Sequence, residues 1–326
     1  MQWTESPIVV SKPGWFTTVQ DLGRYGYQQY GVPVAGVMDW FSTIAANRLV
    51  GNPDQAAVLE LTLKGPELEF QQDAVIAITG GDLSPTIDGV AAPRWQSIKI
   101  ARKRKLRFST PRQGSRSYLA VAGGIDVPVV LGSRSTHSSS GTGGMNGRPL
   151  KQGDLLYNGQ PGRSTERMIG TRLPDRLLPR YRRPTVLRII RGPQENIFTD
   201  AALATLTSST YTLAPQSDRM GYRLSGPQIV RNGSARFISD CTAMGTLQIP
   251  PDGQPILLMA DRQTTGGYPK IAAVITGDLP LAAQLAPGDR VTFTPCSLEQ
   301  AQMALRQLRN MLDDALPPVE SVSVTG

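Results

Sequence analysis

The feature that most constrains the fold is a succession of short apolar runs, each bounded by glycine, proline or small polar residues. Examples are "DAVIAITGG" and "RSYLAVAGG" in the first half and "TVLRIIRG" and "PILLMA" in the second. Runs of this length between turn residues are typical of β-strands. The 33 glycines and 26 prolines among 326 residues fit the same interpretation. The sequence therefore predicts a mainly β protein with a few short helices.

Two segments have helical signals instead. In "DWFSTIAANRLVGN", Asp39 is a candidate N-cap and Gly51 stands where a helix would end. In the C-terminal stretch, Ser297 is followed three residues later by Gln300, which is a capping-box pattern. An apolar stripe follows, so we expect an amphipathic helix over residues 297–314.

The chain is long enough for two domains, each with its own core. Residues 158–184 have little periodicity and many turn-forming residues, which favours a boundary there. We expect an N-terminal β-barrel subdomain over residues 1–165 and a second barrel over residues 185–296.

Several common metal-binding, nucleotide-binding and hydrolase motifs are absent from the sequence. The cysteines Cys241 and Cys296 form no CxxC pair, so neither a zinc site nor a disulfide scaffold is expected. The sequence contains no GxxxxGK[ST], GxGxxG, GxSxG or HExxH motif. Any phosphate site would have to be built from loops that the fold brings together.

Charge and hydropathy bear on location and partners. The formal charge of +8 is concentrated in residues 102–107 and 180–184, without the interleaved aromatics of a nucleic-acid surface. Solvated strand ends, or a face for an acidic partner, are therefore favoured over nucleic acid. The N-terminus lacks a signal-peptide pattern, and no apolar run approaches the roughly 20 residues that span a bilayer. We expect a cytoplasmic protein without a membrane partner.

The stretch "DRQTTGGYPK" has more polar chemistry than a turn requires, and it lies between two apolar runs. Asp261 is a candidate catalytic group, since a carboxylate can act as a base, orient a nucleophile or hold Mg²⁺. Hydroxyl groups and glycine amides suit oxyanions. The candidate substrate- or phosphate-binding residues in this stretch are Gln263, Thr264, Thr265, Gly266, Gly267 and Tyr268. The alternative is a turn in which Asp261 bonds its own backbone.

A second polar motif is "SDRMGYRLSGP", in which Asp218 and Arg219 could form a carboxylate–guanidinium pair and Tyr222 offers a hydroxyl group. The alternative is a surface ion pair, worth only about 0–1 kcal/mol, beside a packed aromatic ring.

The third motif, "VQDLGRYG", contributes Gln20, Asp21 and Arg24. A guanidinium can grip a substrate carboxylate or phosphate through two hydrogen bonds. The alternative is that these residues cap a turn around Gly23.

His137 is the only histidine and precedes the serine- and glycine-rich residues 138–147. Imidazole has an ordinary pKa of about 6.5, so His137 is a candidate catalytic group for proton transfer. The alternative is an exposed loop residue, and the loop itself has the composition of a mobile cover over a site.

Six ordered motifs carry a resemblance to a known family. They are "VQDLGRYGYQQYGVPVAGVMD", "NRLVGN", "LELTLKGPELEF", "GSRSTH", "SDRMGYRLSGP" and "DRQTTGGYPKIAAVI". Together they resemble the biotin-dependent carboxyltransferase family, and within it the 5-oxoprolinase branch. The resemblance implies two cyclophilin-like β-barrel subdomains. It also implies an ATP-dependent lactam hydrolase, active only in complex with 5-oxoprolinase subunits A and B, with ATP as cofactor and Mg²⁺ as a candidate ion.

Two other functions remain open within the same resemblance. One is a regulatory protein that binds a Kip-type kinase inhibitor. The other is a carboxyltransferase component of a biotin-dependent amide carboxylase. The chain has no AMKM-like biotinylation segment, so it could only accept carboxylated biotin from another protein.

Overall fold

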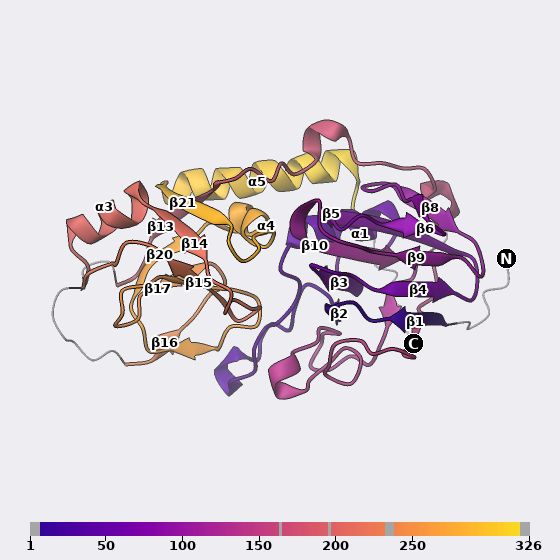
Figure 1. The fold of residues 1–326 in the computed structure, drawn as a ribbon, viewed down its shortest axis with the longest axis horizontal. Helices are drawn as coiled ribbons and strands as arrows, with labels where there is room; N and C mark the ends of the chain where they lie inside the picture. Colours follow the sequence, from indigo (N-terminus) through magenta and orange to yellow (C-terminus); the bar gives the residue numbers. More distant parts are fainter. Residues whose placement is uncertain (1–6, 163–164, 195–196, 232–237, 320–326) are drawn as a thin grey trace. The chain divides into compact units, whose positions relative to one another are not determined.

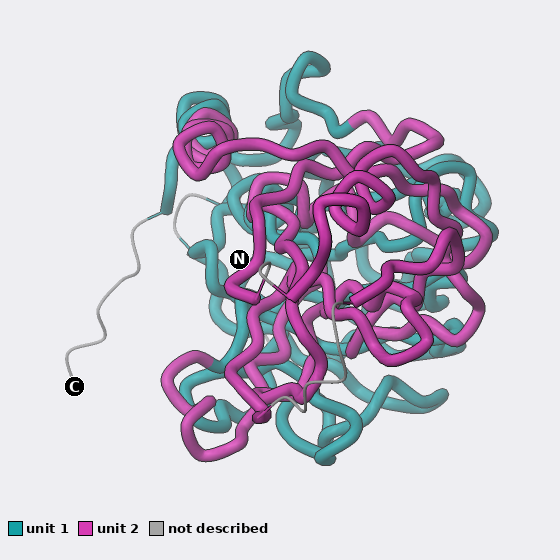
Figure 2. The backbone as a smooth tube through the Cα atoms, turned by 90° about the vertical axis from the view of Figure 1, so that its left-hand side faces the viewer, with its two compact units in different colours: residues 1–24, 39–179, 310–326 teal, residues 25–38, 180–309 magenta. Residues whose placement is uncertain are grey.

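A computed structural model describes residues 7–162, 165–194, 197–231 and 238–319. The chain divides into two compact units, shown in separate colours in Figure 2. The first comprises residues 1–24, 39–179 and 310–326, and the second comprises residues 25–38 and 180–309. The division between residues 179 and 180 falls within the stretch where the sequence suggested a boundary, whereas residues 25–38 group with the second unit.

The first unit contains two β-sheets (Figure 1). The order in the seven-stranded sheet is β11 (Ile125–Asp126), β12 (Leu155–Asn158), β1 (Ile8–Lys12), β4 (Glu67–Phe70), β9 (Lys105–Arg107), β6 (Thr86–Ile87) and β7 (Val90–Ala91). The order in the five-stranded sheet is β2 (Phe16–Gln20), β3 (Val58–Thr62), β10 (Gln113–Val121), β5 (Ala74–Asp82) and β8 (Ser97–Ile100). Strands β5 and β10 are buried along nearly their whole length, as expected for central strands covered on both faces.

Helix α1 (Trp40–Leu49) packs against β5 and β10 of this unit. Its N-cap is Asp39, whose carboxylate accepts a hydrogen bond from the Ser42 amide at 2.9 Å. Gly51 follows the helix with a φ of 76°, a conformation that favours glycine. Shorter helical segments of the unit are η2 (Ser138–Ser140), α2 (Thr165–Met168) and η3 (Asp175–Leu177).

The second unit is built on a closed seven-stranded barrel (Figure 1). The order around it is β13 (Thr185–Arg191), β20 (Lys270–Val274), β17 (Thr246–Gln248), β18 (Ile256–Leu258), β15 (Gly221–Ser225), β14 (Thr210–Leu213) and β21 (Arg290–Pro295). A parallel pairing of β13 with β21 closes the ring. Along β13 the side chains of Leu187 and Ile189 point into the core, as the period of two in a strand requires.

Short elements complete the second unit. Strands β16 (Asp240–Cys241) and β19 (Thr265–Gly266) form a separate two-stranded sheet. The helical segments are η1 (Gln28–Tyr30), α3 (Asp200–Ser208), η5 (Thr276–Asp278) and α4 (Leu279–Ala282).

The C-terminal helix α5 spans Leu298–Ala315. The Ser297 hydroxyl accepts a hydrogen bond from the Gln300 amide at 3.2 Å, and the Gln300 side chain accepts one from the Ser297 amide at 2.9 Å. The capping box and the helix predicted over residues 297–314 are therefore confirmed.

The mainly β prediction with a few short helices is also confirmed, and its clearest barrel is the closed ring of the second unit. Both cysteines are free thiols. Within the described residues, no helix combines the length and the apolar character needed to cross a membrane.

Candidate functional site

The antiparallel pairing of β15 with β18 brings two of the predicted motifs together. Gly221 pairs with Leu258, and the pairing extends beyond the strands because the Asp261 amide donates to the Arg219 carbonyl at 2.8 Å. Residues 42 positions apart in the sequence thus lie side by side.

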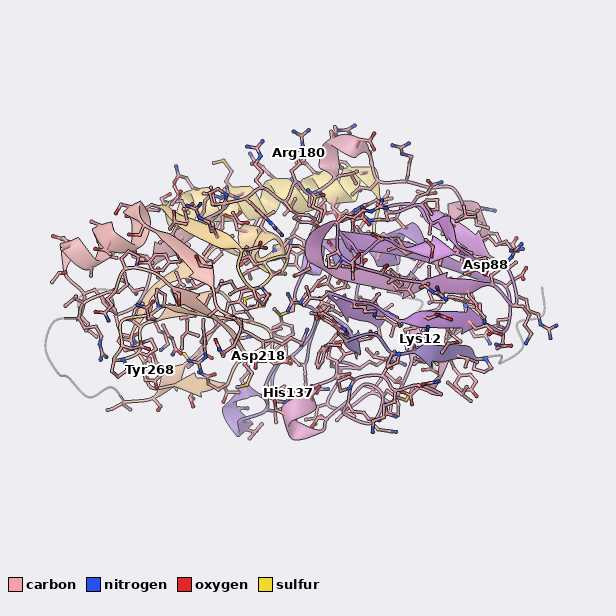
Figure 3. The ribbon with its side chains drawn as sticks, in the orientation of Figure 1. Lys12, Asp88, His137, Arg180, Asp218 and Tyr268 are labelled. Atoms are coloured by element: carbon pink, nitrogen blue, oxygen red, sulfur yellow. The ribbon has the colours of Figure 1, made fainter. Side chains whose placement is uncertain are left out.

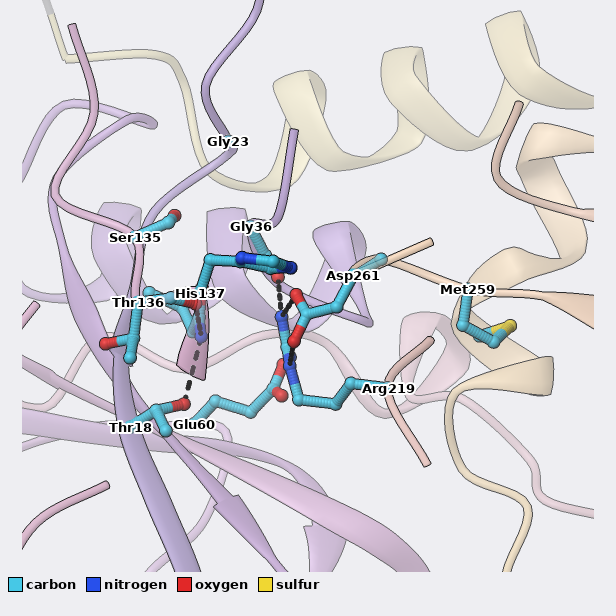
Figure 4. Close-up of polar contacts among 12 residues, drawn as sticks. Thr18, Gly23, Gly36, Glu60, Ser135, Thr136, His137, Arg219, Met259 and Asp261 are labelled. Carbon is cyan, nitrogen blue, oxygen red and sulfur yellow. Dashed lines mark hydrogen bonds and ion pairs between the residues drawn. The ribbon is translucent and has the colours of Figure 1, made fainter. Parts of the chain in front are cut away.

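Arg219 and Asp261 form a buried, bidentate ion pair (Figure 4). Arg219 Nε donates to Asp261 Oδ2 and Arg219 Nη2 donates to Oδ1, both at 2.9 Å. Arg219 Nη2 also donates to the Gly36 carbonyl, which lies in the same unit. The two residues are only 6 % and 7 % exposed, so the pair is buried. The sequence suggested Asp218 as the carboxylate partner of Arg219, whereas the bidentate partner in the structure is Asp261.

Asp261 therefore has each carboxylate oxygen engaged by a guanidinium hydrogen. This geometry favours a carboxylate that positions Arg219. The roles of Asp261 as a base or as a Mg²⁺ ligand stay predictions. Among the described residues, no group of three or more His, Cys, Asp and Glu side chains could hold a metal ion.

Asp218 and Tyr222 lie close together in the sequence, but Asp218 belongs to a turn and Tyr222 to the barrel core. The Asp218 carboxylate accepts hydrogen bonds from the amides of Met220 and Gly221, at 2.8 Å and 3.2 Å, and so shapes the turn before β15. Tyr222 is 2 % exposed and belongs to the barrel core.

The segment after Asp261 is more structured than an open phosphate loop. Thr265 and Gly266 form β19, which pairs with Cys241 and Asp240 of β16. A Cβ atom on Gly266 would come within 2.5 Å of Gln248 Nε2, so the absence of a side chain at position 266 lets that amide approach closely. Gly267 is exposed and has more space around it.

A pocket of about 240 Å³ lies on the β15–β18 side of the barrel. Three residues predicted from the sequence line it, namely Asp218, Gln263 and Tyr268; Figure 3 labels the first and last of these. The full lining is Gln216, Asp218, Met220, Gly221, Arg223, Gln248, Ile256, Leu258, Gln263 and Tyr268.

Sequence reasoning missed Gln248 and Arg223 in this pocket. Gln248 is 1 % exposed, and its side chain donates to the Tyr268 carbonyl at 3.2 Å. The signal that could have found it is a lone amide within the apolar run "GTLQIP", because a buried polar side chain needs a partner.

In the first unit, Asp21 organises a distant loop. Its carboxylate accepts hydrogen bonds from the Ser133 hydroxyl at 2.6 Å, the Arg134 amide at 2.6 Å and the Gly23 amide at 2.9 Å. It also accepts one from the Ser135 hydroxyl. Asp21 thus holds the "GSRSTH" motif in place, in addition to the expected turn around Gly23.

Arg24 and Gln20 attach to the same loop. Arg24 is 1 % exposed and donates to the carbonyls of Val130 and Ser135, each at 2.9 Å. Burial lowers the pKa of Arg24, and the charge of Asp21 partly offsets this. The Gln20 side chain donates to the Thr18 hydroxyl and to the Thr136 carbonyl, each at 3.0 Å.

Each of these two side chains keeps one buried atom without a hydrogen-bond partner, Arg24 Nη1 and Gln20 Oε1. Their other hydrogen bonds go to carbonyls of the loop and, for Gln20, also to the Thr18 hydroxyl. Their role in binding substrate stays a prediction.

His137 is buried, at 6 % exposure, and does not lie on an exposed loop. Its Nδ1 is 2.7 Å from the Ser140 hydroxyl, and its backbone pairs with that of Thr142. The ring is therefore held in a fixed orientation, which a proton-transfer group requires, although that role stays a prediction.

Comparison with known proteins places the chain in a family. Residues 30–295 match the family described as "Carboxyltransferase domain, subdomain A and B". The chain is 40% identical to the C subunit of 5-oxoprolinase from Escherichia coli strain K12, over 91% of this chain and 94% of that protein. It is 33% identical to the C subunit of 5-oxoprolinase from Haemophilus influenzae, over 91% of this chain and 96% of that protein.

Solved structures agree with the sequence comparison. The crystal structure of the Kluyveromyces lactis urea carboxylase superposes with a TM-score of 0.89 at 30% identity. The match covers 99% of this chain but only 30% of that longer protein. The resemblance seen in the sequence motifs is thus confirmed, and the chain belongs to the family of carboxyltransferase domains with subdomains A and B.

Proposed function

We propose that the chain is the C subunit of an ATP-dependent 5-oxoprolinase, which acts with subunits A and B to open 5-oxoproline to L-glutamate. The observation that carries the proposal is the end-to-end similarity to two proteins named as the C subunit of 5-oxoprolinase. The urea carboxylase match, in contrast, covers less than a third of its relative.

The chemistry explains why ATP would be required. A five-membered lactam is a resonance-stabilised amide, so its carbonyl carbon reacts slowly with water unless the carbonyl oxygen is first activated. The described residues form no cluster for Mg²⁺, the sequence has no P-loop motif, and Asp261 is engaged by Arg219. We therefore assign no step of nucleotide chemistry to residues of this chain.

In this proposal the chain contributes substrate binding. The pocket beside β15 and β18 contains the side chains of Gln216, Gln248 and Gln263. A carboxamide has both donors and acceptors, so such a lining can pair with the C=O and N–H groups of a small amide. The Arg219–Asp261 pair locks together the two segments that carry Asp218 and Gln263.

Co-expression with 5-oxoprolinase subunits A and B tests the assembly. We expect the chain to co-elute with the B protein in size-exclusion chromatography and to show no turnover alone. Separate elution of the folded chain, with turnover by the other two proteins alone, would refute the proposal.

A second candidate is carboxyl transfer from a biotinylated protein to a small amide. The observation that favours it is the TM-score of 0.89 against urea carboxylase over nearly the whole chain. The test is to mix the chain with a carboxylated biotin carrier and measure loss of the carboxyl group with and without an amide acceptor. Amide-dependent loss would support this candidate.

A further inference from the structure

Arg262 is a buried cation that has no strong partner in the described structure. It follows Asp261 directly and is 9 % exposed. Its Nη1 lies 3.4 Å from the Met259 carbonyl and 3.5 Å from the Ala260 carbonyl, at the long limit of a hydrogen bond. Its Nε is buried without any hydrogen-bond partner.

Comparison with Arg219 shows what Arg262 lacks. Arg219 grips the two oxygens of Asp261 with the edge formed by Nε and Nη2. The same edge of Arg262 has no such acceptor among the described residues: Nε is buried without a partner, and the two long contacts of the side chain both involve Nη1. A carboxylate pairs with this edge through two parallel hydrogen bonds.

The groups near Arg262 do not neutralise it. Burial lowers the pKa of Arg262, and Tyr25 and Asp261 oppose that effect. Asp261 is already the partner of Arg219, and Tyr25 offers a phenol in place of a carboxylate. A buried charge without its own counter-ion is unfavourable, so the position has an electrostatic cost that Tyr25 and Asp261 offset only in part.

We infer that Arg262 is a binding residue for the oxyanion group of a small molecule, which it would grip through Nε and Nη2 as Arg219 grips Asp261. The ligand class is a carboxylate or a phosphate, since both present oxygens at the spacing of the guanidinium fork. The inference goes beyond the proposed function and does not require the ligand to be 5-oxoproline.

The test compares Arg262→Met with Arg290→Met, which removes an exposed arginine from the same unit. The thermal midpoint of the full chain is measured against rising concentrations of acetate, inorganic phosphate and L-5-oxoproline, with sodium chloride at matched ionic strength. A ligand that binds only the folded state raises the midpoint as its concentration rises. Loss of a charged hydrogen-bonding partner predicts binding at least about 30-fold weaker in Arg262→Met.

The inference predicts two results together. Without ligand, Arg262→Met melts at or above the wild-type temperature, because an unpaired buried charge has been replaced by an apolar side chain. With ligand, stabilisation by acetate or phosphate is lost in Arg262→Met and kept in Arg290→Met.

Either of two outcomes would overturn it. A lower midpoint of Arg262→Met without ligand would show that Arg262 is a structural residue. Equal stabilisation of wild type and Arg262→Met, or none beyond sodium chloride, would show that no oxyanion binds there. The acetate and phosphate arms identify the ligand class. An oxyanion effect without any effect of 5-oxoproline would keep the inference and count against substrate binding at Arg262.

Discussion

Asp261 and Arg219, both candidate site residues from the sequence, form a structural contact with one another. Both side chains are buried, and each carboxylate oxygen is matched by a guanidinium hydrogen. Such a pair is sensitive to the loss of one member, because the other remains buried as an uncompensated charge.

Asp261→Asn should therefore destabilise the second unit. Breaking a buried ion pair from one side typically lowers the free energy of unfolding by about 3–5 kcal/mol. Urea denaturation measures the change, and Asp252→Asn at an exposed turn is the control. The double variant Arg219→Met/Asp261→Leu should recover most of the loss. Wild-type stability of Asp261→Asn would contradict the structural role of the pair.

Asp240 offers a prediction on pH. A hydrogen bond from Lys270 Nζ at 2.9 Å, with further contributions from Cys241, lowers the pKa of Asp240 to about 2. A lowered pKa in the folded state means that the contact stabilises the protein above the unfolded pKa and is lost as the pH falls toward 2.

NMR titration of the Asp240 carboxyl group should give a midpoint near 2 in the wild type. In Lys270→Met the midpoint should rise toward the ordinary value of about 3.9. An unchanged midpoint in that variant would mean that Lys270 is not the cause.

At individual positions, local sequence identified the polar motifs but not their partners. Asp261 and Arg219 were both candidates, yet their pairing depends on the register of β15 and β18. Asp21 was a candidate binding residue, with a cap on a local turn as the alternative, while most of its hydrogen bonds go to a loop about 112 residues away. Contacts over that distance depend on the folded chain and have no local sequence signal.

At the scale of secondary structure, Gly266 of β19 lies close to two side chains that line the pocket, Gln248 and Gln263. Gly266→Ala would place a Cβ 2.5 Å from Gln248 Nε2 and 3.2 Å from Gln263 Nε2. Both atoms end flexible side chains, so we expect them to move and the thermal midpoint to stay near that of the wild type.

The displaced amides should weaken substrate binding. Loss of one or two hydrogen bonds predicts a KM for 5-oxoproline about tenfold higher. Gly267→Ala is a matched control, because its new Cβ would meet only Ser239 Oγ at 3.6 Å. Equal KM values for the two variants would exclude Gln248 and Gln263 from the substrate site.

Helices and strands differed in how well the sequence predicted them. The caps Asp39 and Ser297 act within one helical turn, so the starts of α1 and α5 could be predicted from neighbouring residues. Closure of the barrel depends on β13 pairing in parallel with β21, about a hundred residues later, and no local pattern specifies that pairing.

On the scale of the whole molecule, the two units could be predicted only in outline. The low periodicity of residues 158–184 indicated where the chain passes from one unit to the other. Residues 25–38 join the second unit, where the Gly36 carbonyl accepts a hydrogen bond from Arg219, and their own sequence does not indicate this. The family could be predicted because six short motifs are spread between residues 19 and 275, and the family match over residues 30–295 confirms it.

The central claim is that this chain is a required component of a 5-oxoprolinase. The most direct measurement is 5-oxoproline-dependent ATP hydrolysis, with glutamate quantified alongside, in mixtures of subunits A and B with and without this chain. The proposal predicts glutamate and phosphate in equal amounts only when all three proteins are present. Full turnover without this chain, or none with it in a folded three-protein complex, would contradict the claim.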